Sequence, residues 1–166
     1  MVDFDIVPLS PENLKEALSL VLEVFEVYTE EDPNVWFPAS IEPWKYKSLY
    51  EREKVRDCRY FVAIEKTSNK VIGTTGLYHL ATEPEDVAQV GWYCVAQVYR
   101  GRGIGKKILE WTIKLAHNEG NSKLRLYTST RRDLAAANAV YHKLGFRIIK
   151  TEDWEKHKLT YWELDL

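Results

Sequence analysis

With 166 residues, 45% of them hydrophobic, the chain has the size of a single domain and enough apolar side chains to fill a core. Charged residues make up 29% and the formal net charge is −2, so the overall charge gives no reason to expect a nucleic-acid partner. Residues 1–7 carry acids and no basic residue, which argues against a secretory signal, and no stretch approaches the roughly 18 uninterrupted apolar residues of a membrane span.

The first part of the chain predicts a strand and two helices. Residues 4–9 form a short apolar run typical of a strand. Ser10 and the proline after it provide a helix N-cap and an N1 residue, and apolar residues at helical spacing then extend the helix over 11–25. The polar stretch 28–34, with prolines in and after it, predicts a break, and a second helix is expected over 43–56.

The middle of the chain predicts an antiparallel hairpin. Two strand-like runs, 59–65 and 71–78, flank the polar turn 67–70. An acidic loop follows at 81–86, and a further strand is expected over 89–95.

After residue 95 the order changes to glycine turn, helix, strand and helix. The expected helices are 104–118 and 134–144, and the expected strands are 123–128, 146–151 and 158–164. Gly120 and Gly145 end the two helices. Antiparallel strands followed by a βαβ unit predict one α/β domain.

The two cysteines, Cys58 and Cys94, are too few for a disulfide framework. Both lie in or beside apolar runs, and they have neither the partners nor the spacing of a metal site. We therefore expect free thiols in a reducing, cytoplasmic setting, with no bound metal and no membrane partner.

The turn at 100–106 is the most informative segment. Glycines at 101, 103 and 105 remove the Cβ atoms that would keep a ligand away from the backbone, and the free N–H groups of a helix N-terminus follow directly. Arg100, Arg102 and Lys106 add positive charge beside this predicted anion site. A plain strand-to-helix turn would also explain the glycines.

Other phosphate-binding patterns fail at this turn. A Walker loop needs Ser or Thr after its Gly-Lys pair, and Lys107 stands there instead. The dinucleotide fingerprint lacks its last glycine, which is replaced by Lys106 or, from Gly103, by Ile108. A nucleotide- or RNA-binding function is therefore the weakest alternative.

Two motifs resemble those of the GNAT superfamily of acetyl-CoA-dependent N-acetyltransferases. The run 100–105, Arg-x-x-Gly-x-Gly after a strand, is similar to the acetyl-CoA signature of that family. The run 141–146, Tyr-His-Lys-Leu-Gly-Phe, is similar to its closing motif. With the opening strand and helix, the resemblance covers nearly the whole chain, from about residue 4 to 166.

The resemblance implies a single domain over 1–166 with the acyl-CoA N-acyltransferase fold. This α/β (α+β) fold has a mixed, mostly antiparallel sheet of about seven strands, flanked by about four helices. Two parallel strands, here ending near Val95 and Thr128, would splay apart and admit the pantetheine arm of the cofactor. The arm would hydrogen-bond the backbone of Tyr93, Cys94 and Val95, like an added strand.

The resemblance further implies that acetyl-CoA is the cosubstrate, that no metal takes part, and that the pyrophosphate rests on the glycine turn. The residues expected to bind it are Arg100, Gly101, Arg102, Gly103, Ile104, Gly105 and Lys106.

Acetyl transfer to an amine needs a neutral nucleophile, a polarised carbonyl and a proton for the leaving thiolate. Tyr141 matches the family's tyrosine that faces the cofactor sulfur, so we expect it to be the acid; a core tyrosine is the alternative. Cys94 invites an acyl-enzyme mechanism, but no histidine lies near it in sequence to activate it, and the family transfers the acyl group directly.

The chain departs from the family pattern at two positions. Many relatives carry Asn where this chain has Leu134, and Asn138, one turn further on, is at best a partial substitute. Relatives that acetylate lysine often carry Glu about where Gln89 stands, and glutamine cannot accept a proton at neutral pH. The base is left open among Glu26, His79, Glu83, Glu85 and Asp86.

The acceptor is also left open between a small-molecule amine and a peptide amine. Acidic clusters at 30–32 and 83–86 lie in loops that border the acceptor cleft in the family, which suits a cationic amine, although solvated loops are often acidic in any case. Aromatic residues between 28 and 50 either line a substrate pocket or cover the sheet. The rival function is a non-catalytic acyl-CoA-binding sensor, and a homodimer is one candidate assembly.

Overall fold

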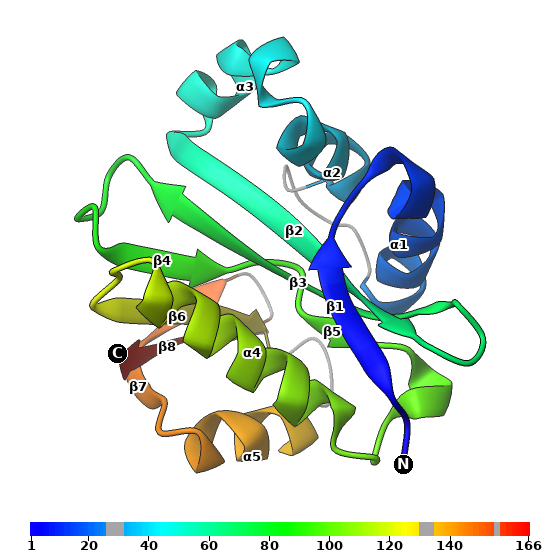
Figure 1. Ribbon diagram of the computed structural model, residues 1–166. Coiled ribbons are helices and arrows are strands. Elements are labelled where there is room, and N and C mark those ends of the chain that lie inside the picture. The colour runs from blue at the N-terminus through cyan, green and yellow to red at the C-terminus, as the bar shows by residue number, and fades with distance from the viewer. Residues whose placement is uncertain (26–31, 130–134, 155–156) are drawn as a thin grey trace.

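Figure 1 shows the computed structural model of the chain, which describes residues 1–25, 32–129, 135–154 and 157–166. The helices within these ranges are α1 (Pro11–Val24), α2 (Pro33–Ile41), α3 (Lys47–Arg52), α4 (Ile104–Asn118) and α5 (Ala135–Lys143), with 3-10 turns η1 (Pro43–Lys45) and η2 (Gln97–Tyr99). The strands are β1 (Phe4–Pro8), β2 (Val55–Glu65), β3 (Val71–Leu80), β4 (Val87–Val90), β5 (Cys94–Val95), β6 (Lys123–Ser129), β7 (Arg147–Trp154) and β8 (His157–Asp165).

One sheet runs through the molecule in the order β1-β2-β3-β4-β6-β8-β7, with β5 paired to β3. Every strand pairing found in the described ranges is antiparallel except that of β4 with β6. The predicted class, α/β with a mixed and mostly antiparallel sheet, is therefore confirmed.

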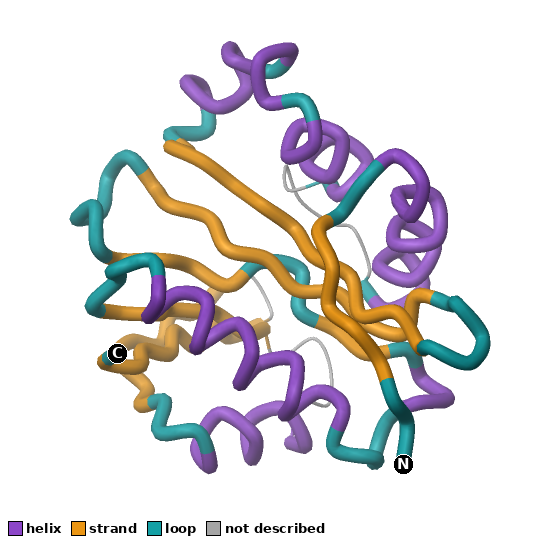
Figure 2. The backbone as a smooth tube through the Cα atoms, viewed as in Figure 1, coloured by secondary structure: helices purple, strands orange, loops and turns teal. Residues whose placement is uncertain are grey.

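Helices cover both faces of this sheet (Figures 1 and 2). Side chains alternate along β2, so Val62 packs in the core cluster of α1 and α2, while Ala63 packs in the cluster of α4. Phe61, on the α4 side, meets Trp111 of α4 with ring centroids 4.9 Å apart. Both faces of the strand are thus buried, which explains its run of apolar residues.

The helix α2 was not predicted, because its prolines were interpreted as a break. Pro33 is in fact the N1 residue, and the Asp32 side chain caps the helix by accepting a hydrogen bond from the Asn34 backbone N–H at 2.9 Å. Pro38 lies inside the helix, which is held in place by the buried Trp36 and Phe37. Tertiary packing outweighs the hydrogen bond that the proline removes.

The predicted hairpin is confirmed, and it is longer than expected. The chain turns at Lys54, whose φ of 55° lies in the left-handed region, so β2 begins at Val55 rather than at residue 59. For the same reason the helix expected over 43–56 is shorter and consists of η1 and α3.

The strand expected over 89–95 is interrupted, and this interruption opens the sheet. β4 pairs with β6 only from Val87 to Gln89. Trp92, with φ of 47°, then turns the chain, and β5 pairs with β3 alone. β6 continues to Ser129 against β8. The two parallel neighbours therefore diverge beyond Gln89, as the resemblance led us to expect.

Candidate active site

The glycine turn lies between η2 and α4, beside the diverging strands. Gly101 and Gly103 have φ of 74° and 76°, and a Cβ at either position would find no atom within 4 Å. The first hydrogen bond of the helix joins the Lys107 N–H to the Gly103 carbonyl at 3.2 Å, so the N–H groups of residues 104–106 precede it. The backbone is thus open to a ligand, and its donors converge there with the positive end of the helix dipole.

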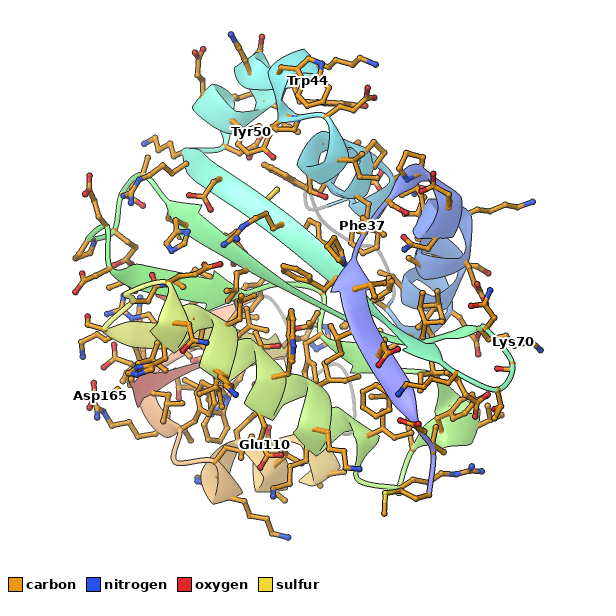
Figure 3. The ribbon with its side chains drawn as sticks, in the orientation of Figure 1. Phe37, Trp44, Tyr50, Lys70, Glu110 and Asp165 are labelled. Carbon is orange, nitrogen blue, oxygen red and sulfur yellow. The ribbon has the colours of Figure 1, made fainter. Side chains whose placement is uncertain are left out.

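The basic side chains of the turn already have partners within the protein. The Arg100 Nε donates to the Val95 carbonyl at 3.0 Å, and the Arg102 guanidinium lies 5.6 Å from the centroid of the Tyr99 ring. Lys106 forms an exposed ion pair with Glu110, labelled on α4 in Figure 3, at 3.0 Å. Any anion bound at the turn would share these cations with their present partners.

The side chain of Ile104, unlike those of the other residues of the turn, is buried in the core. Its side chain is 2% exposed and packs with Ile72 and Ile108. It fixes the first turn of α4 to the sheet, so only its backbone can serve a ligand.

β5 presents one edge to the gap between the strands. Its residues Cys94 and Val95 pair with Thr74 and Gly73 of β3, and the Ala96 N–H donates to the Ile72 carbonyl at 2.9 Å. Because backbone groups alternate in direction along a strand, those of Val95 face away from β3. This edge has the geometry to accept an extended ligand by added-strand pairing.

Tyr141 lies on α5, near the glycine turn but deeper in the protein. The residue is 5% exposed, and its ring centroid lies 5.4 Å from that of Trp162 and 6.4 Å from that of Tyr93. Burial raises its pKa to about 12, so the phenol is protonated at neutral pH. Such a group can donate a proton or a hydrogen bond.

The closing motif, residues 141–146, forms the end of α5 and the turn that follows it. Gly145, with φ of 90°, reverses the chain, and the Phe146 N–H donates to the Tyr141 carbonyl at 3.0 Å. Phe146 is thereby folded back against the Tyr141 ring, with centroids 6.0 Å apart. Glycine and phenylalanine in the motif therefore hold Tyr141 in place.

Asn138 lies one turn before Tyr141, and its buried Oδ1 atom has no hydrogen-bond partner among the residues that the structure describes. Buried polar atoms rarely lack a partner, so this oxygen could accept a hydrogen bond from an amide of a ligand. Leu134, which replaces the family's asparagine, lies outside the described residues.

Four of the five candidate bases lie away from the glycine turn, toward the C-terminal end of α4. His79 is held between Asp57, at 2.9 Å, and Asn121, at 2.8 Å. His79 lines a cavity of about 340 Å³, to which Glu85, Asp86 and Glu119 also contribute. Glu83 forms an ion pair with Arg125 at 2.8 Å.

This cavity lies at the C-terminal end of α4, because Glu119 and Gly120 contribute to it. The glycine turn lies at the other end of the helix, which for 15 residues is about 22 Å long. The acidic loop 81–86 therefore lies at the opposite end of α4 from the glycine turn. The fifth candidate base, Glu26, and the acids Glu30 and Glu31 lie outside the described residues.

Gln89 lies at the last position of β4 that pairs with β6, opposite Tyr78 of β3. It is 7% exposed. Its neighbours Ala88 and Val90 pack toward α4 and α5, so Gln89 faces the α1 side of the sheet.

Most of the aromatic cluster between 28 and 50 belongs to the core. Trp36, Phe37 and Tyr50 are buried, whereas Trp44 is 63% exposed at the outer end of the molecule (Figure 3). Tyr28 lies outside the described residues. The interpretation that these residues cover the sheet is confirmed for the three buried ones.

Both cysteines are free and buried, as expected. The Cys94 Sγ atom lies 3.2 Å from the Thr74 hydroxyl, and the residue is 6% exposed. Among the described residues no cluster of three or more acids, histidines and cysteines could hold a metal ion, and none of the described helices is long and apolar enough to cross a membrane.

From the sequence, Tyr93 was expected to contribute only its backbone to the site. The Tyr93 side chain lies between Tyr141 and the first turn of α4, and its Oη atom lies 2.8 Å from where a Cβ at Gly105 would be. Gly105, the third glycine of the alternating run, is the sequence feature that makes room for Tyr93 Oη, but the sequence alone does not say which side chain fills that space.

Comparisons with known proteins identify the family of the chain. The model of the acetyltransferase (GNAT) family matches residues 21–146. N-acetyltransferase 8B of Homo sapiens is 28% identical over 126 residues, which are 69% of this chain and 54% of that protein. An uncharacterized protein of Mycobacterium leprae is 27% identical over 107 residues, 64% of this chain but 28% of that protein. The match to this chain thus spans about half, or less, of the length of these curated relatives.

The fold is shared with solved structures. An acetyltransferase of the GNAT family from Staphylococcus aureus Mu50 superposes with a TM-score of 0.72, at 18% identity, over 99% of each chain.

Proposed function

The chain belongs to the acetyltransferase (GNAT) family, and on this premise we propose that it transfers an acetyl group from acetyl-CoA to a primary amine, which attacks the thioester directly. The observation that carries the proposal is the divergence of β5 from β6 beside an open glycine turn, with Tyr141 close by. These features lie together although Cys94 of β5 and Tyr141 are 47 positions apart in the sequence.

The residues at the turn fit the pyrophosphate of acetyl-CoA. Open space over Gly101 and Gly103 lets an anion reach the backbone, and the N–H groups of 104–106 can donate to it. Arg102 and Lys106 are exposed at the rim and can add charge, while Arg100 supports the end of β5 through the Val95 carbonyl.

The pantetheine arm would run along β5 as an added strand. The outward backbone groups of Val95 would pair with its amides, and those of Tyr93, two positions earlier, would extend the edge. The backbone groups of Cys94, which was also expected to pair with the arm, face β3 instead. The buried Asn138 Oδ1 atom supports the same path, because an amide N–H of the arm would satisfy it.

Acetyl-CoA supplies an activated thioester, and Tyr141 would hold the proton that the departing thiolate takes. Free Tyr has a pKa of about 10 and a thiol about 8.5, so the transfer depends on a hydrogen bond that forms as charge develops on sulfur. The high pKa of Tyr141 keeps the proton in place until then.

The acceptor remains a small-molecule or peptide amine. A lysine-like amine with a pKa of about 10.4 must first lose a proton, which costs about 4.6 kcal/mol at pH 7. Gln89 cannot take that proton, and three of the described candidates, His79, Glu85 and Asp86, line a cavity at the C-terminal end of α4, opposite the glycine turn. The buried free thiols support a reducing compartment, which we propose is the cytoplasm.

The test starts with calorimetric titration of the purified chain with acetyl-CoA, ATP and NAD, followed by a panel of amines with a free-thiol readout. We expect binding of acetyl-CoA alone, and thiol release that depends on the amine. Binding without thiol release for any amine would favour the sensor instead.

A pair of glycine variants makes the binding test specific. Gly103→Val should weaken acetyl-CoA and CoA alike, because it closes the approach to the backbone. Gly120→Val is the matched control: Gly120 also has a positive φ, of 87°, and open space around it, but it lies at the other end of α4. Equal CoA affinity in the two folded variants would contradict the proposed site.

A further inference from the structure

Tyr93 lies where the chain leaves β4 and enters β5, and its side chain connects the two parts of the proposed site. Trp92 packs on the opposite face of the sheet, against Phe25, with ring centroids 5.3 Å apart. Tyr93 instead packs with the residues of α4 and α5, in both core clusters on that face. Its phenol therefore lies between the first turn of α4 and Tyr141.

Gly105 fixes the level of the Tyr93 hydroxyl along α4. A Cβ at 105 would lie 2.8 Å from Tyr93 Oη and 3.5 Å from Val95 Cγ2. Gly105 is not among the glycines with positive φ, so its lack of a side chain serves space rather than backbone conformation. Because Cβ atoms in a helix lean toward its N-terminus, a group at that position lies level with the free N–H groups of the first turn.

The Tyr93 hydroxyl has no hydrogen-bond acceptor among the residues that the structure describes, and the residue keeps part of its surface exposed. Burial raises the pKa of Tyr93, and a negative charge on Tyr141 would raise it further. The phenol is therefore a protonated donor at neutral pH. Tyr50 provides a contrast, because its buried hydroxyl donates to the Ala39 carbonyl at 3.0 Å.

We propose that the Tyr93 hydroxyl donates a hydrogen bond to a phosphate oxygen of the acyl-CoA pyrophosphate, beside the N–H groups of the first turn of α4. The inference rests on the proposed function and assigns a further binding residue to it. The contact is made equally before and during acetyl transfer, so it lowers the dissociation constant and KM and leaves kcat unchanged.

The test compares wild-type protein with Tyr93→Phe, which removes only the hydroxyl. Dissociation constants are measured for CoA, 3′-dephospho-CoA and pantetheine, which lacks the pyrophosphate. We expect Tyr93→Phe to weaken the first two about 10- to 100-fold, the range for a lost hydrogen bond to a charged group, and to leave pantetheine unchanged. Tyr50→Phe is the control: it should lower the melting temperature and leave all three affinities unchanged.

A second variant tests the position of the hydroxyl without any ligand. Gly105→Ala should lower the melting temperature in wild type, because its Cβ meets Tyr93 Oη, and should do so less in a Tyr93→Phe background, where the remaining contacts of 3.5 and 3.8 Å are ordinary. An equal effect in both backgrounds would overturn the placement.

The binding outcomes separate this inference from the proposed function. Unchanged CoA affinity in folded Tyr93→Phe, or an equal loss for pantetheine, overturns the inference while the proposed function stands. No binding of CoA by the wild-type protein overturns both.

Discussion

At the residue scale, Tyr141 is the side chain whose two interpretations can be separated most cleanly. Its ring packs against Trp162 and Phe146, and its hydroxyl has no hydrogen-bond acceptor within the described ranges. The ring of Tyr141 packs in the core, whereas only its hydroxyl can donate a proton. A substitution that keeps the ring and removes the hydroxyl therefore separates the structural role from the catalytic one.

Tyr141→Phe keeps the ring and removes the hydroxyl. If the hydroxyl protonates the leaving thiolate, turnover should fall roughly 10²-fold or more, with CoA affinity nearly unchanged. Melting temperature, CoA affinity and turnover are measured on one preparation. Wild-type turnover with a lowered melting temperature would make Tyr141 a purely structural residue.

The raised pKa of Tyr141 predicts how stability and turnover change with pH. Its folded value of about 12 exceeds the unfolded value of about 10, so its contribution to stability is complete below about pH 10 and is lost as the pH rises toward 12. We expect kcat to show no descending limb below about pH 10. A fall near pH 8 would mean that another group is the acid.

Cys94 is expected to be dispensable for chemistry. It is buried against the Thr74 hydroxyl, on the face of the sheet that α1 covers. Cys94→Ala should therefore keep substantial turnover, with some loss of stability from the space left in the core. Mass spectrometry after incubation with acetyl-CoA provides the check: an acetylated Cys94 that an amine discharges would reverse this expectation.

At the scale of elements, the C-terminal half of the sheet is tied together by charge. Glu163 on β8 is 4% exposed, and its carboxylate accepts hydrogen bonds from Lys123 and Arg125 of β6 and from Arg147 of β7, at 2.7–2.8 Å. Burial alone would raise the pKa of Glu163, but these cations outweigh it and the pKa is lowered. The carboxylate thus links three neighbouring strands far from the glycine turn.

Glu163→Gln should lower the free energy of unfolding by roughly 2–4 kcal/mol, somewhat less than for a fully buried ion pair because the cations are partly exposed. Since its folded pKa is depressed, the contribution of Glu163 is present above about pH 4 and is lost as the pH falls further, so the difference from wild type should shrink in acid. Urea unfolding at two pH values measures this.

The control for this element is Glu42→Gln, because Glu42 pairs with Lys45 at 2.7 Å on the exposed surface. It should change stability by less than about 1 kcal/mol. Equal losses in the two variants would mean that burial of Glu163 contributes nothing.

At the scale of the whole molecule, the continuous sheet makes the two halves one unit. The proposed site lies at their junction, with β5 from the N-terminal half and α5 from the C-terminal half. A ligand held there would stabilise both halves together, and the chain is predicted to be one domain.

We therefore expect a single cooperative thermal transition that CoA shifts as a whole. At 100 times its dissociation constant a ligand adds about 2.7 kcal/mol, which for a chain of this length raises the melting temperature by about 5–10 °C. Scanning calorimetry at two protein concentrations also tests the homodimer that is one candidate assembly, because the melting temperature of a dimer would rise with concentration. Two transitions, with one shifted by CoA, would contradict a single domain.

The class of fold, the hairpin, α4 and the two family motifs could be predicted from the sequence, because each depends on local chemistry. The N-cap and N1 proline start α1, alternating glycines open the turn, and Gly145 turns the chain after α5. Interpreting prolines locally was wrong for α2, where the buried Trp36 and Phe37 stabilise a helix that contains Pro38.

Which distant residues share a site depends on how the elements pack in three dimensions. The acidic loop 81–86 and His79 are near the glycine turn in sequence but lie at the opposite end of α4, because a βαβ crossover returns the chain along the whole length of the sheet. Tyr93 and Gly105 are twelve positions apart, and their contact depends on how α4 packs on β5. Local patterns do not say which side chains of separate elements come into contact, so the base candidates could not be ranked until the elements were packed together.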